Sequence, residues 1–199
     1  MKFPESGIMH AYLDGLKGIE IGAGYHNPFG LDTINVDYIQ HGPDTYEGRE
    51  QQYLAGQVAH VDVIADACRL PFEDKSYDFV INSHVFEHMY SPIHALNEWN
   101  RVARQYIALI VPDKDRCGEN AFSETTIREA WDRYYTYDPN DSEHLVNKHW
   151  THWKLGSFTA LAADLGFHIL RCDDKDDKVG NGFLVILHAQ AIEPGRGGM

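Results

Sequence analysis

Basic residues are scarce in this sequence. Its 199 residues include 17 Lys and Arg against 30 Asp and Glu, a formal net charge of −13 with the twelve histidines taken as neutral. No run of Lys or Arg is long enough to form a basic arm, so neither nucleic acid nor an anionic membrane is expected as a partner. Protonation of the histidines would nearly cancel the charge, so we expect activity to fall on acidification.

Long hydrophobic runs, cysteine pairs and a phosphate-binding loop are also lacking. The longest apolar runs have the length of a strand, far below the ~20 residues of a membrane-spanning helix. Glu5 falls where the apolar region of a signal peptide would begin. Cys68, Cys117 and Cys172 form no CxxC pair, so we expect buried, reduced thiols in a cytoplasmic protein. The absence of Gly-Lys-Ser/Thr excludes a P-loop.

Short apolar runs bounded by turn residues are what the sequence does contain. With 43% hydrophobic residues, it can fill one sizeable core, and its length fits a single domain over residues 1–199. Helical spacing opened by Ser91 and Pro92 predicts a crossover helix over 92–103, and a second helix is expected from Ser157 to Gly166. A short polar turn then predicts one antiparallel hairpin in an otherwise parallel α/β sheet. The expected strands are 18–21, 33–36, 61–64, 78–81, 106–111, 167–170 and 183–188.

One long segment interrupts this alternation of strands and helices. Residues 112–156 are rich in aromatic and histidine side chains, with helical spacing only over 124–135. An insertion of this length between sheet elements is typical of a lid or a substrate-shaping segment, so we expect it to cover an acceptor. Its aromatic residues could form a wall against a flat ring or a sugar face, or could simply pack on the sheet. They are Trp131, Tyr134, Tyr135, Tyr137, Trp150 and Trp153.

A glycine-rich turn follows the first predicted strand. Gly22 and Gly24 permit a tight reversal and a close approach of a ligand to the backbone. A dinucleotide fingerprint would have a third glycine near position 27, where this chain has Asn27-Pro28, so a hydride-transferring Rossmann enzyme is disfavoured. Only residues 25–32 separate the turn from the next strand, and Pro28 interrupts them, so no full helix is expected there.

Acidic residues stand at or near the ends of three predicted strands. Asp37 follows 33–36, Asp66 follows 61–65, and Glu20 lies in the first strand. A carboxylate after the second strand can accept ribose hydroxyls, and one after the third can accept an adenine amine. Carboxylates would attract a cationic sulfonium or ammonium group and repel a triphosphate. Each could alternatively be a helix cap or a turn former.

These segments together resemble the class I S-adenosylmethionine-dependent methyltransferases. The likeness is carried by Glu20-Ile-Gly-Ala-Gly, Asn35-Val-Asp-Tyr, the stretch 65–80, and Ser83-His-Val-Phe-Glu-His with the Glu-Trp-Asn-Arg-Val that follows it. It is most similar to small methyltransferases of bacterial surface-glycan and secondary-metabolite gene clusters. The resemblance implies a Rossmann-like sheet of seven strands, mostly parallel with one antiparallel, and helices on both faces. It also implies a cofactor site formed by Glu20, Gly22, Ala23, Gly24, Asp37, Tyr38, Asp66, Ala67 and Ser83.

Histidines form a second group of candidate site residues. His84-x-x-Glu87-His88 has the pattern of an inverted zinc-protease helix, but it directly follows a strand and precedes Ser91-Pro92, so we expect no metal site of that kind. Near neutral pH an imidazole can act as a general base for a hydroxyl acceptor, and metal binding or hydrogen bonding remain alternatives. The candidate catalytic residues are His84, His88, His144, His149 and His152.

The function predicted from the sequence is methyl transfer from S-adenosyl-L-methionine to a small acceptor, such as a hydroxyl or amine of a sugar or glycan precursor. The acceptor is the expected partner, and the sequence leaves the oligomeric state open. Two alternatives remain: a regulatory protein that binds a nucleoside cofactor without transfer activity, and a metal-dependent enzyme that uses the histidine clusters.

Overall fold

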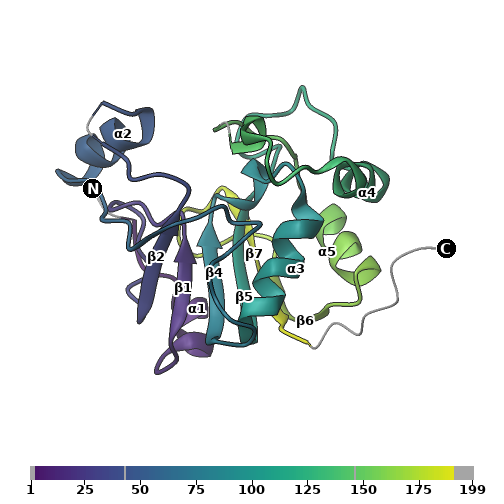
Figure 1. Cartoon of the computed structure of the whole chain (residues 1–199), viewed down its shortest axis with the longest axis horizontal. Coiled ribbons are helices and arrows are strands. Elements are labelled where there is room, and N and C mark those ends of the chain that lie inside the picture. The colour runs from purple at the N-terminus through teal and green to yellow at the C-terminus, as the bar shows by residue number, and fades with distance from the viewer. Residues whose placement is uncertain (1–2, 43, 146, 191–199) are drawn as a thin grey trace.

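The structure is a computed structural model that describes residues 3–42, 44–145 and 147–190. Its centre is a seven-stranded sheet in the order β3-β2-β1-β4-β5-β7-β6 (Figure 1). β7 runs antiparallel to both of its neighbours, and all other pairs are parallel. This confirms the predicted α/β class, including the one reversed strand. The strands are β1 (Gly18–Ile21), β2 (Thr33–Asp37), β3 (Val63–Ile64), β4 (Tyr77–Ser83), β5 (Ala103–Pro112), β6 (His168–Asp173) and β7 (Gly182–His188).

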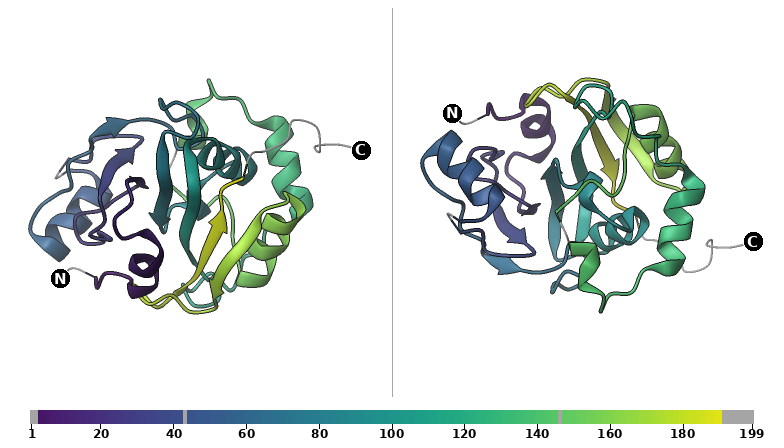
Figure 2. Two further views of the ribbon diagram at one scale, coloured as in Figure 1. Left: turned by 90° about the horizontal axis from the view of Figure 1, so that it is seen from below. Right: turned by 90° about the horizontal axis from the view of Figure 1, so that it is seen from above.

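Within the described residues, five α-helices and two short 3-10 helices accompany the sheet. They are α1 (Gly7–Leu13), α2 (Tyr46–Ala55), η1 (Phe86–His88), α3 (Pro92–Val102), α4 (Ile127–Thr136), η2 (Ser142–Leu145) and α5 (Leu155–Asp164). α1 and α3 lie on opposite sides of the sheet (Figure 2). This arrangement buries both faces, as a mostly parallel sheet requires.

The two faces have separate cores because the side chains of each strand alternate in direction. On the face of α3 and α5, Leu96, Trp99 and Phe158 pack against Ile107 and Leu109 of β5. The face covered by α1 has a smaller core, made by Met9 and Leu13 of the helix, Phe29 of a loop and neighbouring strand residues. Alternate residues of β5 therefore enter different cores.

No helix follows the glycine-rich turn, as the sequence predicted. Residues 22–32 form turns and bends, and Phe29 is fully buried under α1. α2 lies between β2 and β3 in the chain, but it stands above the carboxyl edge of the sheet instead of covering a face (Figure 1). Only Gly48 and Gln51 of this helix are buried. The result is an open region above the strand ends.

Some boundaries differ from the predictions. α5 begins at Leu155, and Ser157 is its third residue, where its hydroxyl accepts a hydrogen bond from the Lys154 backbone N–H. α4 begins after Thr126, which forms a capping box with Glu129. Cys172 is exposed on edge strand β6, so the expectation of a buried thiol is wrong there. Within the described residues, no helix has both the length and the apolar character needed to cross a membrane.

The insertion between β5 and α5 is anchored through Trp153. This residue bridges to Asp113 at the end of β5, and its ring packs on Phe86 and Phe158. The backbone N–H groups of Trp150 and Thr151 donate to the carbonyl of Glu87 in η1, at 2.9 and 3.1 Å. The end of the insertion is therefore fixed to the loop that follows β4.

Candidate active site

A cavity of about 520 Å³ lies at the carboxyl ends of β1, β2 and β4, beneath α2 and part of the insertion. This volume is typical of a small-molecule site. The strand ends bring together residues far apart in the sequence, as predicted. Of the predicted site residues, the cavity is lined by Gly22, Gly24, Asp37, Tyr38, Asp66, Ala67, Ser83, His84, His88, His144 and His149.

Three predicted site residues do not line the cavity. Glu20 points to the other face of the sheet, where its buried carboxylate accepts a hydrogen bond from Thr33 at 3.3 Å and burial raises its pKa to about 7. Ala23 donates its backbone N–H to Asn35 Oδ1. His152 stacks on the ring of Phe122.

Gly22 forms the floor of the cavity next to β4. Its φ of +69° is in the left-handed region, which favours glycine. An added Cβ would lie 2.7 Å from a methyl carbon of Val85, so the position has no room for a side chain. Its N–H donates to the carbonyl of Val36, which joins the turn to β2. The backbone here is therefore fixed in a shape that leaves space above it for a ligand.

Asp37 is the carboxylate at the end of β2. One oxygen accepts the Tyr38 backbone N–H at 2.7 Å, and the other lies 3.2 Å from Nε2 of His41. The hydrogen bond to Asp37 raises the pKa of His41. His41 also lies 3.6 Å from Glu47 of α2, so it sits between two carboxylates. No sequence pattern pointed to His41, which comes from an irregular segment.

Asp66 contacts the insertion directly. Oδ1 accepts the Cys68 backbone N–H at 2.8 Å, whereas Oδ2 accepts the hydroxyl of Tyr137 at 2.9 Å and lies 3.0 Å from Nε2 of His144. Burial is the largest cause of a raised pKa for Tyr137, so its hydroxyl keeps its proton. His144, predicted as a catalytic residue, is thus placed beside the predicted adenine ligand.

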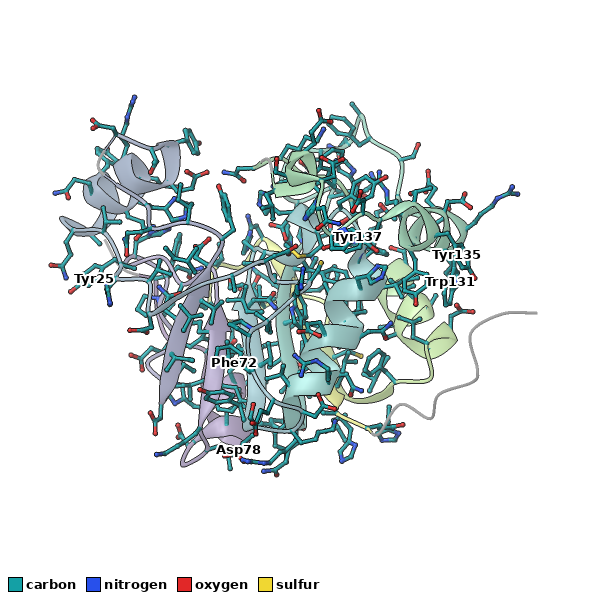
Figure 3. All side chains as sticks on the ribbon, in the orientation of Figure 1. Tyr25, Phe72, Asp78, Trp131, Tyr135 and Tyr137 are labelled. Carbon is teal, nitrogen blue, oxygen red and sulfur yellow. The ribbon has the colours of Figure 1, made fainter. Side chains whose placement is uncertain are left out.

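For the aromatic residues of the insertion, the sequence left open either a wall against the acceptor or simple packing on the sheet. Among the described residues, none of the six insertion aromatics lines the main cavity. Trp153 is core, and the Trp131 indole donates to Asp164 of α5. Figure 3 shows Trp131 and Tyr135 on the outer side of α4. Packing of the insertion was the simpler alternative, and it holds.

Three histidines converge on one buried carboxylate. Glu87 is 2% exposed, and burial raises its pKa to about 8. Its Oε1 lies 3.9 Å from Nδ1 of His84, 3.7 Å from Nε2 of His88 and 3.9 Å from Nε2 of His149. Burial lowers the pKa of His84, and that of His88 to about 4, so both rings are neutral at pH 7. Glu87 was not predicted as a site residue from the sequence, although it lies within the HxxEH pattern.

Comparisons with known proteins agree with this geometry. Residues 25–110 match the family model described as a methyltransferase domain. No curated protein matches the chain significantly. An S-adenosylmethionine-dependent methyltransferase from Thermotoga maritima, titled a possible histamine N-methyltransferase, superposes with a TM-score of 0.56 at 17% identity, covering 92% of this chain and 86% of that one.

Two further solved structures have the same fold. A methyltransferase from Methanosarcina mazei gives a TM-score of 0.51 at 17% identity over 92% of this chain and 96% of its own. A chain from the complex of a Haloferax volcanii methyltransferase with its activator Trm112 gives 0.55 at 15% identity, over 92% and 85%. These likenesses establish the Rossmann-like methyltransferase fold.

The residues at the cavity fit the cofactor that this fold implies. Gly22 presents bare backbone to the cavity at a position with no room for a side chain, and the carboxylates of Asp37 and Asp66 suit a cationic nucleoside. Residues 25–110 thus match a methyltransferase domain, and the chain has the fold of S-adenosylmethionine-dependent methyltransferases.

Proposed function

We propose that this protein is an S-adenosylmethionine-dependent methyltransferase that methylates a hydroxyl or amine of a small polar acceptor, of the class of sugars and glycan precursors. The proposal rests mainly on the cluster of three imidazoles and one carboxylate near Ser83, at the end of the cavity away from Asp37. Such a surface can hydrogen-bond a polyhydroxylated molecule, whereas a flat aromatic acceptor would need apolar walls. The resemblance to methyltransferases of glycan gene clusters supports the same class.

For the cofactor, we propose that Asp37 binds the ribose, Asp66 and Ala67 the adenine, and the turn of Gly22 and Gly24 the methionine end. When bound, the cofactor supplies a methyl group on a cationic sulfur. Asp66 can bind an adenine amine without losing its Cys68 contact, because a carboxylate accepts about four hydrogen bonds. Glu20 makes no direct contact with the cofactor in this arrangement, because its side chain points to the other face of the sheet.

For the acceptor, we propose that His84, His88 and His149 position the reacting group, with a neutral imidazole available to take its proton. Positioning accounts for most of the rate enhancement when the acceptor must approach a carbon in line with its leaving group. His144 and His152 have no direct part in this step, since one contacts Asp66 and the other lies outside the cavity.

The remaining proposals concern the whole chain. Residues 1–199 form one domain, and the insertion at about 112–156 serves as the acceptor lid, supported by its contacts with Asp66 and η1. The free thiols of Cys68, Cys117 and Cys172 favour the cytoplasm. The charge of −13 disfavours nucleic acid as a substrate.

Calorimetry with S-adenosylhomocysteine, followed by a transfer assay, tests the function. We expect the wild type to bind S-adenosylhomocysteine. It should also form this product when S-adenosylmethionine and a suitable sugar or nucleotide-sugar acceptor are supplied. A protein that binds the cofactor but turns over none of a broad acceptor panel would instead be regulatory. No heat of binding in several buffers would contradict the cofactor assignment itself.

A further inference from the structure

Glu87 is a buried carboxylate that lacks protein hydrogen bonds. Neither Oε1 nor Oε2 has a hydrogen-bond partner among the described residues, and the side chain is 2% exposed. A buried charge without a partner is costly, so such a group requires either a proton or a cation. The groups around it indicate which.

The nitrogens facing Glu87 have the spacing of metal ligands. Their distances to Oε1, 3.7 to 3.9 Å, exceed hydrogen-bond length. In a tetrahedral site with bonds of ~2.1 Å, neighbouring ligand atoms are about 3.4 Å apart. The ligand atoms of Glu87, His88 and His149 all lie within 4.8 Å of one another, so small side-chain movements bring all three onto one ion.

The outer nitrogens of both rings face acceptors. Nδ1 of His88 forms a 3.1 Å hydrogen bond with the carbonyl of Lys148, and Nδ1 of His149 lies 2.5 Å from Glu119 Oε1, close to this carboxylate but without hydrogen-bond geometry. With the proton on Nδ1, each ring presents an unprotonated Nε2 toward Glu87. Metal-binding histidines almost always have such outer partners, a carbonyl or a carboxylate.

The backbone holds the three groups in place without any ion. Glu87 and His88 are neighbours in η1, and the carbonyl of Glu87 accepts the N–H groups of Trp150 and Thr151, directly after His149. A zinc site of the HxxEH type needs His84 and His88 on one helix, which the sequence around them does not allow. This requirement does not apply here, because the second histidine ligand comes from the insertion.

We propose that Glu87, His88 and His149 bind one divalent transition-metal ion at the acceptor end of the cavity, with His84 beside it. Two imidazoles and a carboxylate form a donor set found in catalytic zinc sites, and imidazole selects such ions over Mg²⁺ and Ca²⁺. Three protein ligands leave a position open toward the cavity. An acceptor hydroxyl bound there would lose its proton more readily. Only this role of the ion rests on the proposed function; its binding does not.

Metal binding is tested first on the full chain, freed of metal by a chelator that is then removed. We expect calorimetry with Zn²⁺ to show one site per chain, and Co²⁺ to give the visible absorption of a nitrogen-containing site. Glu87→Gln, His88→Gln and His149→Gln should each weaken Zn²⁺ binding by about 100-fold or more. Glu119→Gln, which alters only an outer partner, should weaken it by about 10- to 100-fold.

The matched control is His188→Gln, an exposed histidine at the opposite end of the sheet, whose Zn²⁺ affinity should equal that of the wild type. Circular dichroism and binding of S-adenosylhomocysteine identify any variant that fails to fold. Because the ligand substitutions spare Asp37 and Asp66, we expect each variant to bind this product within about threefold of the wild type. Failure of Zn²⁺ to bind, or binding that survives all three ligand substitutions, would overturn the site.

A chelation experiment separates this inference from the proposed function. Stoichiometric Zn²⁺ in a protein that methylates no sugar acceptor would leave the metal site standing and remove the acceptor class. Transfer to a sugar that continues at full rate in metal-free protein would keep the acceptor class and remove the ion's role in the reaction, whereas binding of the ion is decided by the calorimetry. Loss of transfer on chelation, with recovery when Zn²⁺ is returned, supports both.

Discussion

The two ends of the cavity are built in different ways. At the cofactor end, Gly22, Asp37 and Asp66 each follow or end a strand of the sheet, and their places follow from the parallel topology. At the acceptor end, Glu87 and His88 meet His149, which comes from an insertion about sixty residues further along the chain. The first end is thus fixed by the fold, and the second depends on how the insertion packs.

The largest effect is expected when a side chain is added at Gly22, at the cofactor end of the cavity. Gly22→Val places a branched side chain at a φ of +69° and against Val85, so the turn must change shape. Affinity for S-adenosylhomocysteine, measured by calorimetry, should fall by more than 100-fold. The Zn²⁺ affinity of the same variant should change little. Loss of both would show that the two ends are one structural unit.

A smaller loss is expected when one polar contact is removed. Asp66→Ala deletes the proposed acceptor for the adenine amine, and hydrogen bonds to charged groups contribute about 1.5–3 kcal/mol. Binding of S-adenosylhomocysteine should weaken by roughly 10- to 150-fold. Asp62→Ala provides a control, because its carboxylate lies near the same strand but contacts Asn35 outside the cavity. Equal losses for both variants would contradict a specific role for Asp66.

The link between the two ends can be weakened by removing one hydroxyl. Tyr137→Phe deletes the hydrogen bond from the insertion to Asp66 Oδ2 and so leaves that oxygen available to the cofactor. We expect S-adenosylhomocysteine to bind up to about fivefold more tightly. Tyr135→Phe, on the outer side of α4 (Figure 3), should have no effect. Weaker binding by Tyr137→Phe would mean that the insertion completes the cofactor end.

The smallest effect concerns stability of the metal-free protein. Burial raises the pKa of Glu87 to about 8, so between about pH 5 and 8 the folded state binds more protons here than the unfolded state does. Stability should therefore fall as the pH rises through this range. Glu87→Gln should flatten the decline of Tm by a few degrees, leaving the part due to Glu20, whose pKa is raised to about 7. Added Zn²⁺ should reverse the decline only when Glu87 is present.

The pH dependence of the transfer rate distinguishes buried histidines from exposed ones. The sequence predicts a loss of activity on acidification near the ordinary pKa of imidazole. Burial keeps His88 neutral down to about pH 4 and lowers the pKa of His84. We therefore expect transfer rates that hold between about pH 6 and 8 and decline below that range. A midpoint near 6.5 would point to a different, exposed imidazole.

The sequence predicted the fold and most of the cofactor end because the necessary signals are local. Short apolar runs and turn residues located the strands, and strand ends located Asp37 and Asp66. Glu20 does not line the cavity, because the alternation of side chains within β1 directs it to the other face of the sheet. Helix boundaries were predicted wrongly where the N-cap is an unusual residue type, as with Lys154 before α5.

The acceptor end could be predicted only in part, for physical reasons. Histidines could be identified as candidates, but their partners lie far away in the sequence, as His144 shows with Asp66. Glu87 was overlooked because its importance comes from burial, and one carboxylate within a loop pattern does not reveal that. The aromatic residues of the insertion had no periodicity beyond α4 to separate packing from a cavity wall.

One contact spans the entrance of the cavity, between Asn147 of the insertion and Glu47 of α2. α2 and the insertion both stand above the carboxyl edge of the sheet (Figure 1), so this contact, with those of Tyr137 and His144 on Asp66, closes over the nucleoside compartment. Departure of the demethylated nucleoside then requires a segmental opening after each reaction. The first turnover would be faster than the following ones, and pre-steady-state measurements would show a burst.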